Sequence, residues 1–264
     1  MIVHAAARIV RAMRADDVLA STLGWPPGRV VVISPHLDDA VLSLGATIAR
    51  ASRRGARVCI LTVLAGDPES QLPAGGWDRE AGFVTQGEAA VGRREEDRRA
   101  CGILGADPVW LPFPDSQYVH PRHEGDVVSA VHGVVQGADG VLLPGHPLSN
   151  RDHAWLTTTL LGSGLPAGQV GFYAEQPYAG RLGVQRSVPG AIEGLRVAWR
   201  PAQTRLLHRV TKVRAISSYR SQLPLLGLSQ RRHAGLVRML RAAHPAGLEE
   251  LGWIEGDAGR AAQL

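Results

Sequence analysis

Short, continuous apolar runs alternate along the chain with longer stretches of helical periodicity. The apolar runs predict strands at 30–33, 57–64, 108–111, 140–143, 169–173 and 195–199. The periodic stretches predict helices at 4–23, 40–52, 86–104, 125–136, 153–161, 202–217 and 230–243. Strands without polar alternation are typical of a sheet that is covered on both faces, and their alternation with helices predicts β-α-β units.

These elements predict an α/β fold: a Rossmann-like open parallel sheet with helices on both faces, in a single domain. We expect an N-terminal helical extension at 1–28, because Trp25-Pro26-Pro27-Gly28 interrupts the first helix, and one domain at 29–264. The Gly- and Pro-rich stretch 65–85 is long for a connection inside a compact domain. Connections of this length are often lids over a functional site.

Composition narrows the classes of protein without choosing a function. The 264 residues carry a formal net charge of +5, but the arginines lie in helical patterns interleaved with acidic or apolar residues. We therefore interpret them as solvated helix faces and expect no nucleic-acid partner. We also expect no signal peptide and no membrane span. Cys59 and Cys101 stand outside any Cys-x-x-Cys pattern, so the chain is expected to be cytoplasmic with reduced thiols.

Polar residues gather where the predicted strands end. The sequence Pro35-His36-Leu37-Asp38-Asp39 follows the first strand, and Asp152-His153 follows the fourth. In an open parallel sheet, ligands bind at the carboxyl ends of the strands. His36, Asp39 and His153 therefore form a candidate nitrogen and oxygen ligand set for zinc with one position left open. His146, after the same strand, could replace His153, although Asp152 as a carboxylate partner for a ligating imidazole favours His153.

Asp38 has two interpretations. A carboxylate beside a metal ligand is a candidate general base for a hydrolytic reaction. An acidic residue at the start of a helix is also a common N-cap, which the helix dipole favours. The imidazole before it and the Asp-His pair after a later strand favour the metal site.

The chain resembles the PIG-L/LmbE-like de-N-acetylases over residues 29–178, with a weaker similarity at 212–222. The motifs that carry the resemblance are His-x-Asp-Asp at 36–39, Arg-x-x-Glu at 93–96 followed by Leu-Gly at 104–105, Pro-Asp at 114–115 and Asp-His at 152–153. The resemblance implies zinc ligands at His36, Asp39 and His153 and a general base at Asp38. It also implies a substrate contact at Arg93, for which a surface ion pair with Glu96 is the alternative.

One position departs from the family pattern. The family usually has His-Pro-Asp-His before the fourth helix, with the first histidine in the oxyanion-stabilising or general-acid role, and this chain has Asn150-Arg151-Asp152-His153. Asparagine can donate a hydrogen bond to an oxyanion but cannot supply a proton. Either Asn150 is the donor while Asp38 carries the proton, or His146 takes the role.

The function that the resemblance implies is zinc-dependent hydrolysis of an N-acetyl group on an amino sugar or sugar conjugate, with release of acetate. The alternatives are an amidase for a bulkier acyl-amino sugar or thiol conjugate, and a metal-bearing but inactive binding protein. Substrate contacts are expected at Arg93, Asp115 and Tyr173. The partner is a small N-acetylated sugar or glycoconjugate, and iron(II) in place of zinc in the cell and a homo-oligomeric state are left open.

Overall fold

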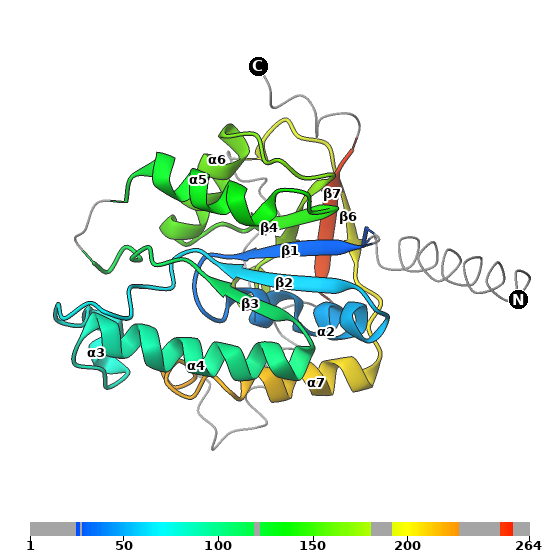
Figure 1. Ribbon diagram of the computed structural model, residues 1–264. Helices are drawn as coiled ribbons and strands as arrows, with labels where there is room; N and C mark the ends of the chain where they lie inside the picture. Colours follow the sequence, from blue (N-terminus) through cyan, green and yellow to red (C-terminus); the bar gives the residue numbers. More distant parts are fainter. Residues whose placement is uncertain (1–24, 27, 119–121, 181–191, 227–248, 256–264) are drawn as a thin grey trace, which may run out of the picture.

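The computed structural model describes residues 25–26, 28–118, 122–180, 192–226 and 249–255. These residues form a seven-stranded sheet in the order β3-β2-β1-β4-β5-β7-β6 (Figure 1). The strands are β1 (Arg29–Ser34), β2 (Arg57–Thr62), β3 (Asp107–Trp110), β4 (Gly140–His146), β5 (Val170–Ala174), β6 (Val197–Pro201) and β7 (Glu250–Ile254). The first five in this order pair in parallel, as the apolar runs predicted.

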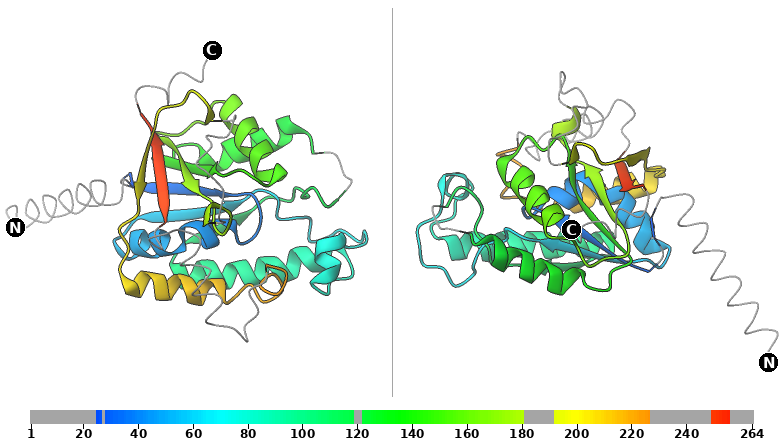
Figure 2. Two further views of the ribbon diagram at one scale, coloured as in Figure 1. Left: turned by 180° about the vertical axis from the view of Figure 1, so that it is seen from behind. Right: turned by 90° about the horizontal axis from the view of Figure 1, so that it is seen from above.

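Helices cover both faces of the sheet, which confirms the layered α/β architecture (Figures 1 and 2). One layer contains α2 (Asp39–Arg53), α4 (Gln86–Leu104) and α7 (Leu206–Ile216). The other contains α5 (Glu124–Val135) and α6 (Arg151–Gly162). Successive β1 residues belong alternately to two hydrophobic clusters. Val30 and Val32 belong to the cluster that includes α2, and Val31 and Ile33 belong to the cluster that includes α5 and α6. This burial on both faces explains the continuous apolar run.

The sheet departs from the prediction at one edge, where β7 pairs antiparallel with β5 and with β6. The sequence analysis missed β7. It also missed α3 (Gly76–Glu80), a short helix inside the 65–85 connection, and the 3-10 turn η1 (Tyr178–Gly180). The helices predicted at 4–23 and 230–243 lie outside the described residues, so the division at 28/29 stays a prediction.

The helix termini follow from local sequence. At the start of α4, the Thr85 hydroxyl accepts a hydrogen bond from the Glu88 amide, and the Glu88 carboxylate accepts one from the Thr85 amide. The helix ends at Gly105, whose φ of 73° suits glycine. Both ends of this helix were predicted correctly because each carries its own capping residue.

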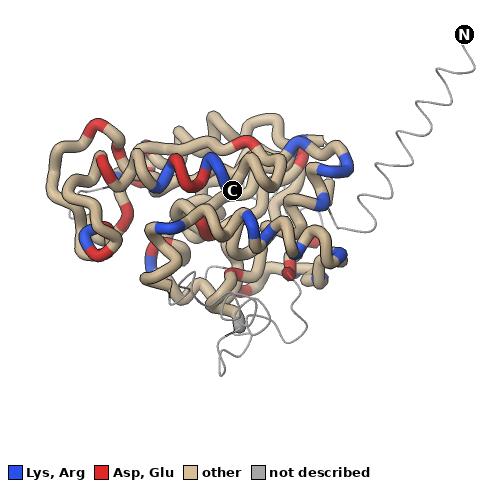
Figure 3. Tube along the Cα trace, turned by 90° about the horizontal axis from the view of Figure 1, so that it is seen from below, with Lys and Arg blue, Asp and Glu red and all other residues tan. Residues whose placement is uncertain are grey.

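Charges of both signs are interleaved along α4, whereas the charged residues of α7 are all basic (Figure 3). Along α4, Glu95 forms ion pairs with Arg98 and with Arg99, and Arg99 Nη1 lies 3.0 Å from Glu95 Oε1. This arrangement is typical of a solvated helix face, as predicted. Among the described residues, none of the helices has the length and apolar character that crossing a membrane requires.

Strand order places the site. β1 lies between β2 and β4, and the chain leaves these strands toward opposite faces, into α2 after β1 and α6 after β4. A crevice at such a reversal of strand order is the usual ligand site of an open α/β sheet. The predicted site residues of 36–39 and 150–153 flank this crevice.

Candidate metal centre

The turn between β1 and α2 is held by its own side chains. The Ser34 hydroxyl donates to the His36 carbonyl at 2.6 Å and accepts from the Ala40 amide at 3.0 Å. The Asp39 carboxylate accepts from the His36 amide at 2.9 Å. Asp38 occupies the N-cap position of α2, but its side chain makes no cap hydrogen bond, so capping does not account for the carboxylate. Ser34 satisfies the first turn of α2 instead and leaves the Asp38 carboxylate for another role.

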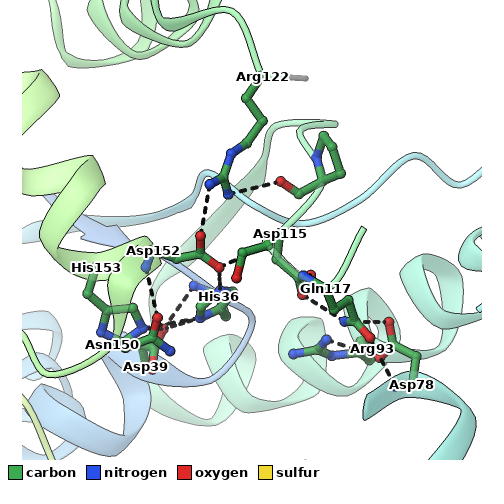
Figure 4. Close-up of polar contacts among 12 residues, drawn as sticks. His36, Asp39, Asp78, Arg93, Asp115, Gln117, Arg122, Asn150, Asp152 and His153 are labelled. Carbon is green, nitrogen blue, oxygen red and sulfur yellow. Dashed lines mark hydrogen bonds and ion pairs between the residues drawn. The ribbon is translucent and has the colours of Figure 1, made fainter. Parts of the chain in front are cut away.

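His36, Asp39 and His153 meet at one point, as the sequence predicted (Figure 4). His36 Nδ1 lies 3.2 Å from Asp39 Oδ2, and His153 Nε2 lies 3.1 Å from the same oxygen. The two imidazole nitrogens are 3.2 Å apart. These are the atoms that ligate a metal, and each comes from an element that adjoins the crevice.

The far nitrogen of each imidazole contacts a carboxylate. His36 Nε2 lies 3.2 Å from Asp152 Oδ2, and His153 Nδ1 bonds to Glu175 Oε1. The prediction that Asp152 is the carboxylate partner of the His153 imidazole is therefore wrong. The side chain of Asp152 turns toward His36, where it also accepts from the Ser116 amide and from Arg122. Carboxylates at these positions hold the rings in place and fix the proton on the far nitrogen.

The geometry fits a metal ion. With the far nitrogens of His36 and His153 protonated, Nδ1 of His36 and Nε2 of His153 present lone pairs to Asp39 Oδ2. Three electron-pair donors within 3.2 Å of one another repel unless a cation lies between them. Tetrahedral zinc ligands at about 2.0 Å from the ion stand about 3.3 Å apart, which matches the observed triangle.

The electrostatics of the site also favour a cation. Burial disfavours a charged imidazolium, yet contacts with Asp152 and Asp39 outweigh it and raise the pKa of His36 to about 9. For His153, Asp39 and Glu175 overcome the same burial and raise the pKa to about 10. The two imidazoles lower the pKa of Asp39 below its usual range despite its burial. Surroundings that attract a proton to both rings attract a divalent cation for the same reason.

Asp38 lines the pocket beside this triangle, 8% exposed, with a backbone φ of 129°. This φ is one that L residues rarely adopt, and such strain is concentrated at functional sites. Burial, followed by the neighbouring Asp39, raises the pKa of Asp38 to about 8, although Arg93 opposes the shift. A buried carboxyl with a pKa near neutrality can both accept and return a proton.

Arg93 comes from α4 and lines the same pocket, 8% exposed. Its Nη1 lies 3.2 Å from Asp78 Oδ1, whereas Glu96 accepts from Ser221, so the surface-pair interpretation of Arg93 and Glu96 is wrong. Asp115 also lines the pocket, as predicted, and accepts from Gln117. The Arg93 and Asp115 side chains therefore lie where substrate hydroxyls can reach them (Figure 4).

Asn150 and His146 differ in their placement. Asn150 caps α6, because its Oδ1 accepts from the Asp152 amide at 2.9 Å. This bond assigns the oxygen, so the Nδ2 group is the part left to donate into the pocket that Asn150 lines. His146 is the last residue of β4 and belongs neither to the ligand cluster nor to the residues that line the pocket.

The pocket has a volume of about 240 Å³. It is lined by His36, Asp38, Asp39, Leu42, Trp77, Arg93, Asp115, Ser116, Gln117, Asn150, Asp152, Tyr178, Gln222 and Leu226. The prediction of Tyr173 as a substrate contact is wrong. Its side chain is fully buried and its hydroxyl donates to the Ile33 carbonyl at 2.9 Å, inside the sheet core.

The observed roles of two functional residues, Glu175 and Gln222, were not predicted from the sequence. Glu175, which bonds His153, directly follows β5, so its place at a strand tip is the signal that points to it. Gln222, which lines the pocket, lies in the weak motif at 212–222, whose position after α7 gives no indication that it returns to the crevice.

Comparison with known proteins gives consistent matches. The sequence profile of the family "PIG-L: GlcNAc-PI de-N-acetylase" matches residues 31–161. The 2'-N-acetylparomamine deacetylase of Streptomyces fradiae is 32% identical over 171 residues, a match that covers 58% of this chain and 59% of that protein. The match thus spans less than two thirds of this relative.

Solved structures match over more of the chain. The A40926 pseudoaglycone deacetylase has 28% identity and a TM-score of 0.68, over 86% of this chain and 96% of that one. A deacetylase of the teicoplanin biosynthesis pathway has 25% identity and a TM-score of 0.70, over 87% and 99% of the two chains. The family profile, which matches residues 31–161, includes both segments that flank the crevice, 36–39 and 150–153.

Proposed function

We propose that the chain is a member of the PIG-L family of de-N-acetylases, whose profile matches residues 31–161, and that it hydrolyses the N-acetyl group of an amino sugar or sugar conjugate and releases acetate. The observation that carries the proposal is the triangle of His36, Asp39 and His153 with the Asp38 carboxylate beside it in one pocket. The relatives support it, since their names describe a 2'-N-acetylparomamine deacetylase and a deacetylase of the A40926 pseudoaglycone.

We propose that His36, Asp39 and His153 hold a zinc ion. Bound there, the ion would supply Lewis acidity, which polarises the amide carbonyl and makes water a stronger acid at neutral pH. Two imidazoles and one carboxylate also suit iron(II), so metal analysis of protein from its own cells decides between the two.

In the proposed reaction Asp38 carries the proton. Its carboxylate takes a proton from the attacking water as the oxygen–carbon bond forms. The same carboxyl then gives that proton to the sugar nitrogen as the carbon–nitrogen bond breaks, so amide and water become acetic acid and amine, which leave as acetate and ammonium after transfer of the acid proton. Burial and the neighbouring Asp39 raise the pKa of Asp38, which makes its carboxylate a stronger base toward water than that of a free aspartate.

Asn150 is the proposed hydrogen-bond donor to the oxygen of the former carbonyl. Its Oδ1 is engaged in the α6 cap, which holds the amide plane and leaves Nδ2 as the donor. Arg93 and Asp115 are proposed to bind sugar hydroxyls from the other side of the pocket. Their partners Asp78 and Gln117 hold them in position.

The cytoplasm is the compartment we propose for this activity. Cys59 and Cys101 are both buried and free, which fits a reducing environment.

Acetate release from a panel of N-acetylated amino sugars tests the proposal. The zinc-loaded wild type is expected to release one acetate per free amine formed, and Asp38→Asn to retain the metal and lose nearly all turnover. Glu95→Gln, which changes a carboxylate on the exposed face of α4, is the matched control. Release from longer acyl amides but not acetamides would favour the bulkier-acyl alternative. Metal retention without hydrolysis of any amide in the panel would favour a binding protein.

A further inference from the structure

The 65–85 connection presents one large aromatic side chain to the pocket. Trp77, in α3, lines the pocket and remains 39% exposed. Its only polar group is already bonded, because Nε1 donates to Gln222 Oε1 at 2.7 Å. What the indole offers to the pocket is therefore carbon surface, and this surface is in contact with water until a ligand covers it.

Gln222 is built to hold that indole. The side chain is 1% exposed, and its Nε2 donates to Ser221 Oγ at 2.9 Å while Oε1 accepts from Trp77. Ser221 is fastened in turn to α4, because Glu96 accepts from its amide at 2.9 Å and from its hydroxyl at 2.6 Å. Both ends of the Gln222 amide make hydrogen bonds within the protein, which fixes the side chain that holds the Trp77 indole.

The base of α3 is fixed as well. Asp78 is 2% exposed and accepts from Arg93 at 3.2 Å and from Gln117 Nε2 at 3.0 Å. Trp77 is thus attached at its ring by Gln222 and at its backbone through Asp78. A fixed ring costs less conformational entropy on binding than a mobile one, which favours its use as a recognition surface.

The residues that line the pocket are therefore of two chemical kinds, charged or polar and apolar. His36, Asp38, Asp39 and Arg93 contribute charged or polar groups to the lining, whereas Trp77, Leu42 and Leu226 contribute apolar surface. A pyranose ring matches both, since its hydroxyl rim and acetamido group are polar while its C–H faces are apolar. A purely polar ligand would leave the indole surface exposed to water, and a purely apolar ligand would leave the pocket carboxylates without hydrogen-bond partners.

We propose that Trp77 is a specificity-determining residue, the surface against which a C–H face of the substrate's sugar ring packs, with Gln222 as the residue that positions it. The inference rests on the proposed function and deepens it, because it names the ring, in addition to the acetamido group, as a recognised part of the substrate.

The test compares two amides and two variants in the zinc-loaded protein. N-acetylglucosamine contains the ring, and N-acetylethanolamine contains the acetamido group without it. Trp77→Ala is expected to lower kcat/KM for N-acetylglucosamine about tenfold or more, mainly through KM, and to leave kcat/KM for N-acetylethanolamine unchanged. Gln222→Met is expected to give a smaller change of the same kind.

Phe83→Ala is the matched control. Phe83 belongs to the same connection and lies over Gly92 of α4, outside the residues that line the pocket. Its removal loosens the connection without removing pocket surface, so both kcat/KM values are expected to stay near those of the wild type. An equal loss on both amides in Trp77→Ala, or the same ring-selective loss in Phe83→Ala, would overturn the proposal.

A binding measurement separates this proposal from the reaction itself. Calorimetric titration of N-acetylglucosamine into Asp38→Asn is expected to detect binding, and the added Trp77→Ala change to weaken it about tenfold or more. If the wild type hydrolyses no amide but Trp77→Ala still weakens sugar binding, the reaction fails and the ring contact stands. If the wild type is active and Trp77→Ala leaves sugar binding unchanged, or if no sugar binds, the ring contact fails.

Discussion

The strained backbone at Asp38 gives the sharpest prediction, because stability and activity are expected to change in opposite directions. Asp38 adopts a φ of 129° with its carboxylate buried beside Asp39. Glycine adopts this φ without strain, so Asp38→Gly is expected to release about 1–3 kcal/mol of backbone strain. The greater freedom of glycine in the unfolded chain returns about 0.5–1 kcal/mol of this.

The net gain is expected to be about 1 kcal/mol, and the loss of repulsion between Asp38 and Asp39 adds to it. For a chain of this size such a gain raises Tm by about 2–4 °C. Turnover is expected to fall about 10²- to 10⁴-fold, the usual contribution of a general base. Metal content should not change, since the ligand triangle consists of His36, Asp39 and His153.

The assay is thermal unfolding followed by circular dichroism, with acetate release and metal content measured on the same samples. Asp38→Asn is the control, because asparagine tolerates positive φ and keeps the side-chain volume while removing the charge. It is expected to lose turnover with a smaller gain in Tm. An Asp38→Gly protein that is no more stable than the wild type would refute the strain argument, and full turnover in either variant would refute the role of the carboxylate.

Three further predictions concern the surroundings of the site. Glu175→Gln removes the charge that orients His153 and is expected to weaken zinc affinity about 10- to 100-fold in a calorimetric titration; unchanged affinity would contradict the role of this carboxylate. Asn150→Ala is expected to lower kcat about 10²- to 10³-fold with the metal retained, and a change in KM alone would argue against an oxyanion donor. Lys212→Met breaks a buried ion pair with Glu249 and is expected to lower the free energy of unfolding by about 3–5 kcal/mol in denaturant titration, and adding Glu249→Gln is expected to restore part of this loss. A loss under 1 kcal/mol would show that the α2 amides alone satisfy Glu249.

Local signals explain which parts of the fold could be predicted. The strands β1, β2 and β4 are buried on both faces, so each is a continuous apolar run that the sequence displays directly. In contrast, β7 has the sequence Glu250–Ile254 with a glycine at its centre and pairs antiparallel with two strands. Its formation depends on those neighbours more than on its own residues, which is why the sequence pattern missed it.

The candidate site divides in the same way. His36, Asp39 and His153 each follow a strand of the sheet, so the carboxyl-end position of these residues predicts that they meet. Tyr173 was predicted as a substrate contact, but it lies within β5 and its fully buried side chain belongs to the core. The 65–85 connection, which contains Trp77, was predicted to be a lid, but the sequence does not indicate the contact of Trp77 with Gln222, because the two residues are 145 positions apart. Long-range side-chain contacts of this kind leave no periodic signal.

Metal binding tests the central claim most directly. The measurement is calorimetric titration of zinc into chelator-treated wild type, His153→Ala and the control His132→Ala, whose imidazole contacts Ser163 away from the pocket. We predict about one equivalent of tightly bound zinc in the wild type and in His132→Ala, and loss of that binding in His153→Ala. Absence of zinc binding in the wild type, or equal binding in all three proteins, would contradict the assignment of His36, Asp39 and His153 as a metal centre.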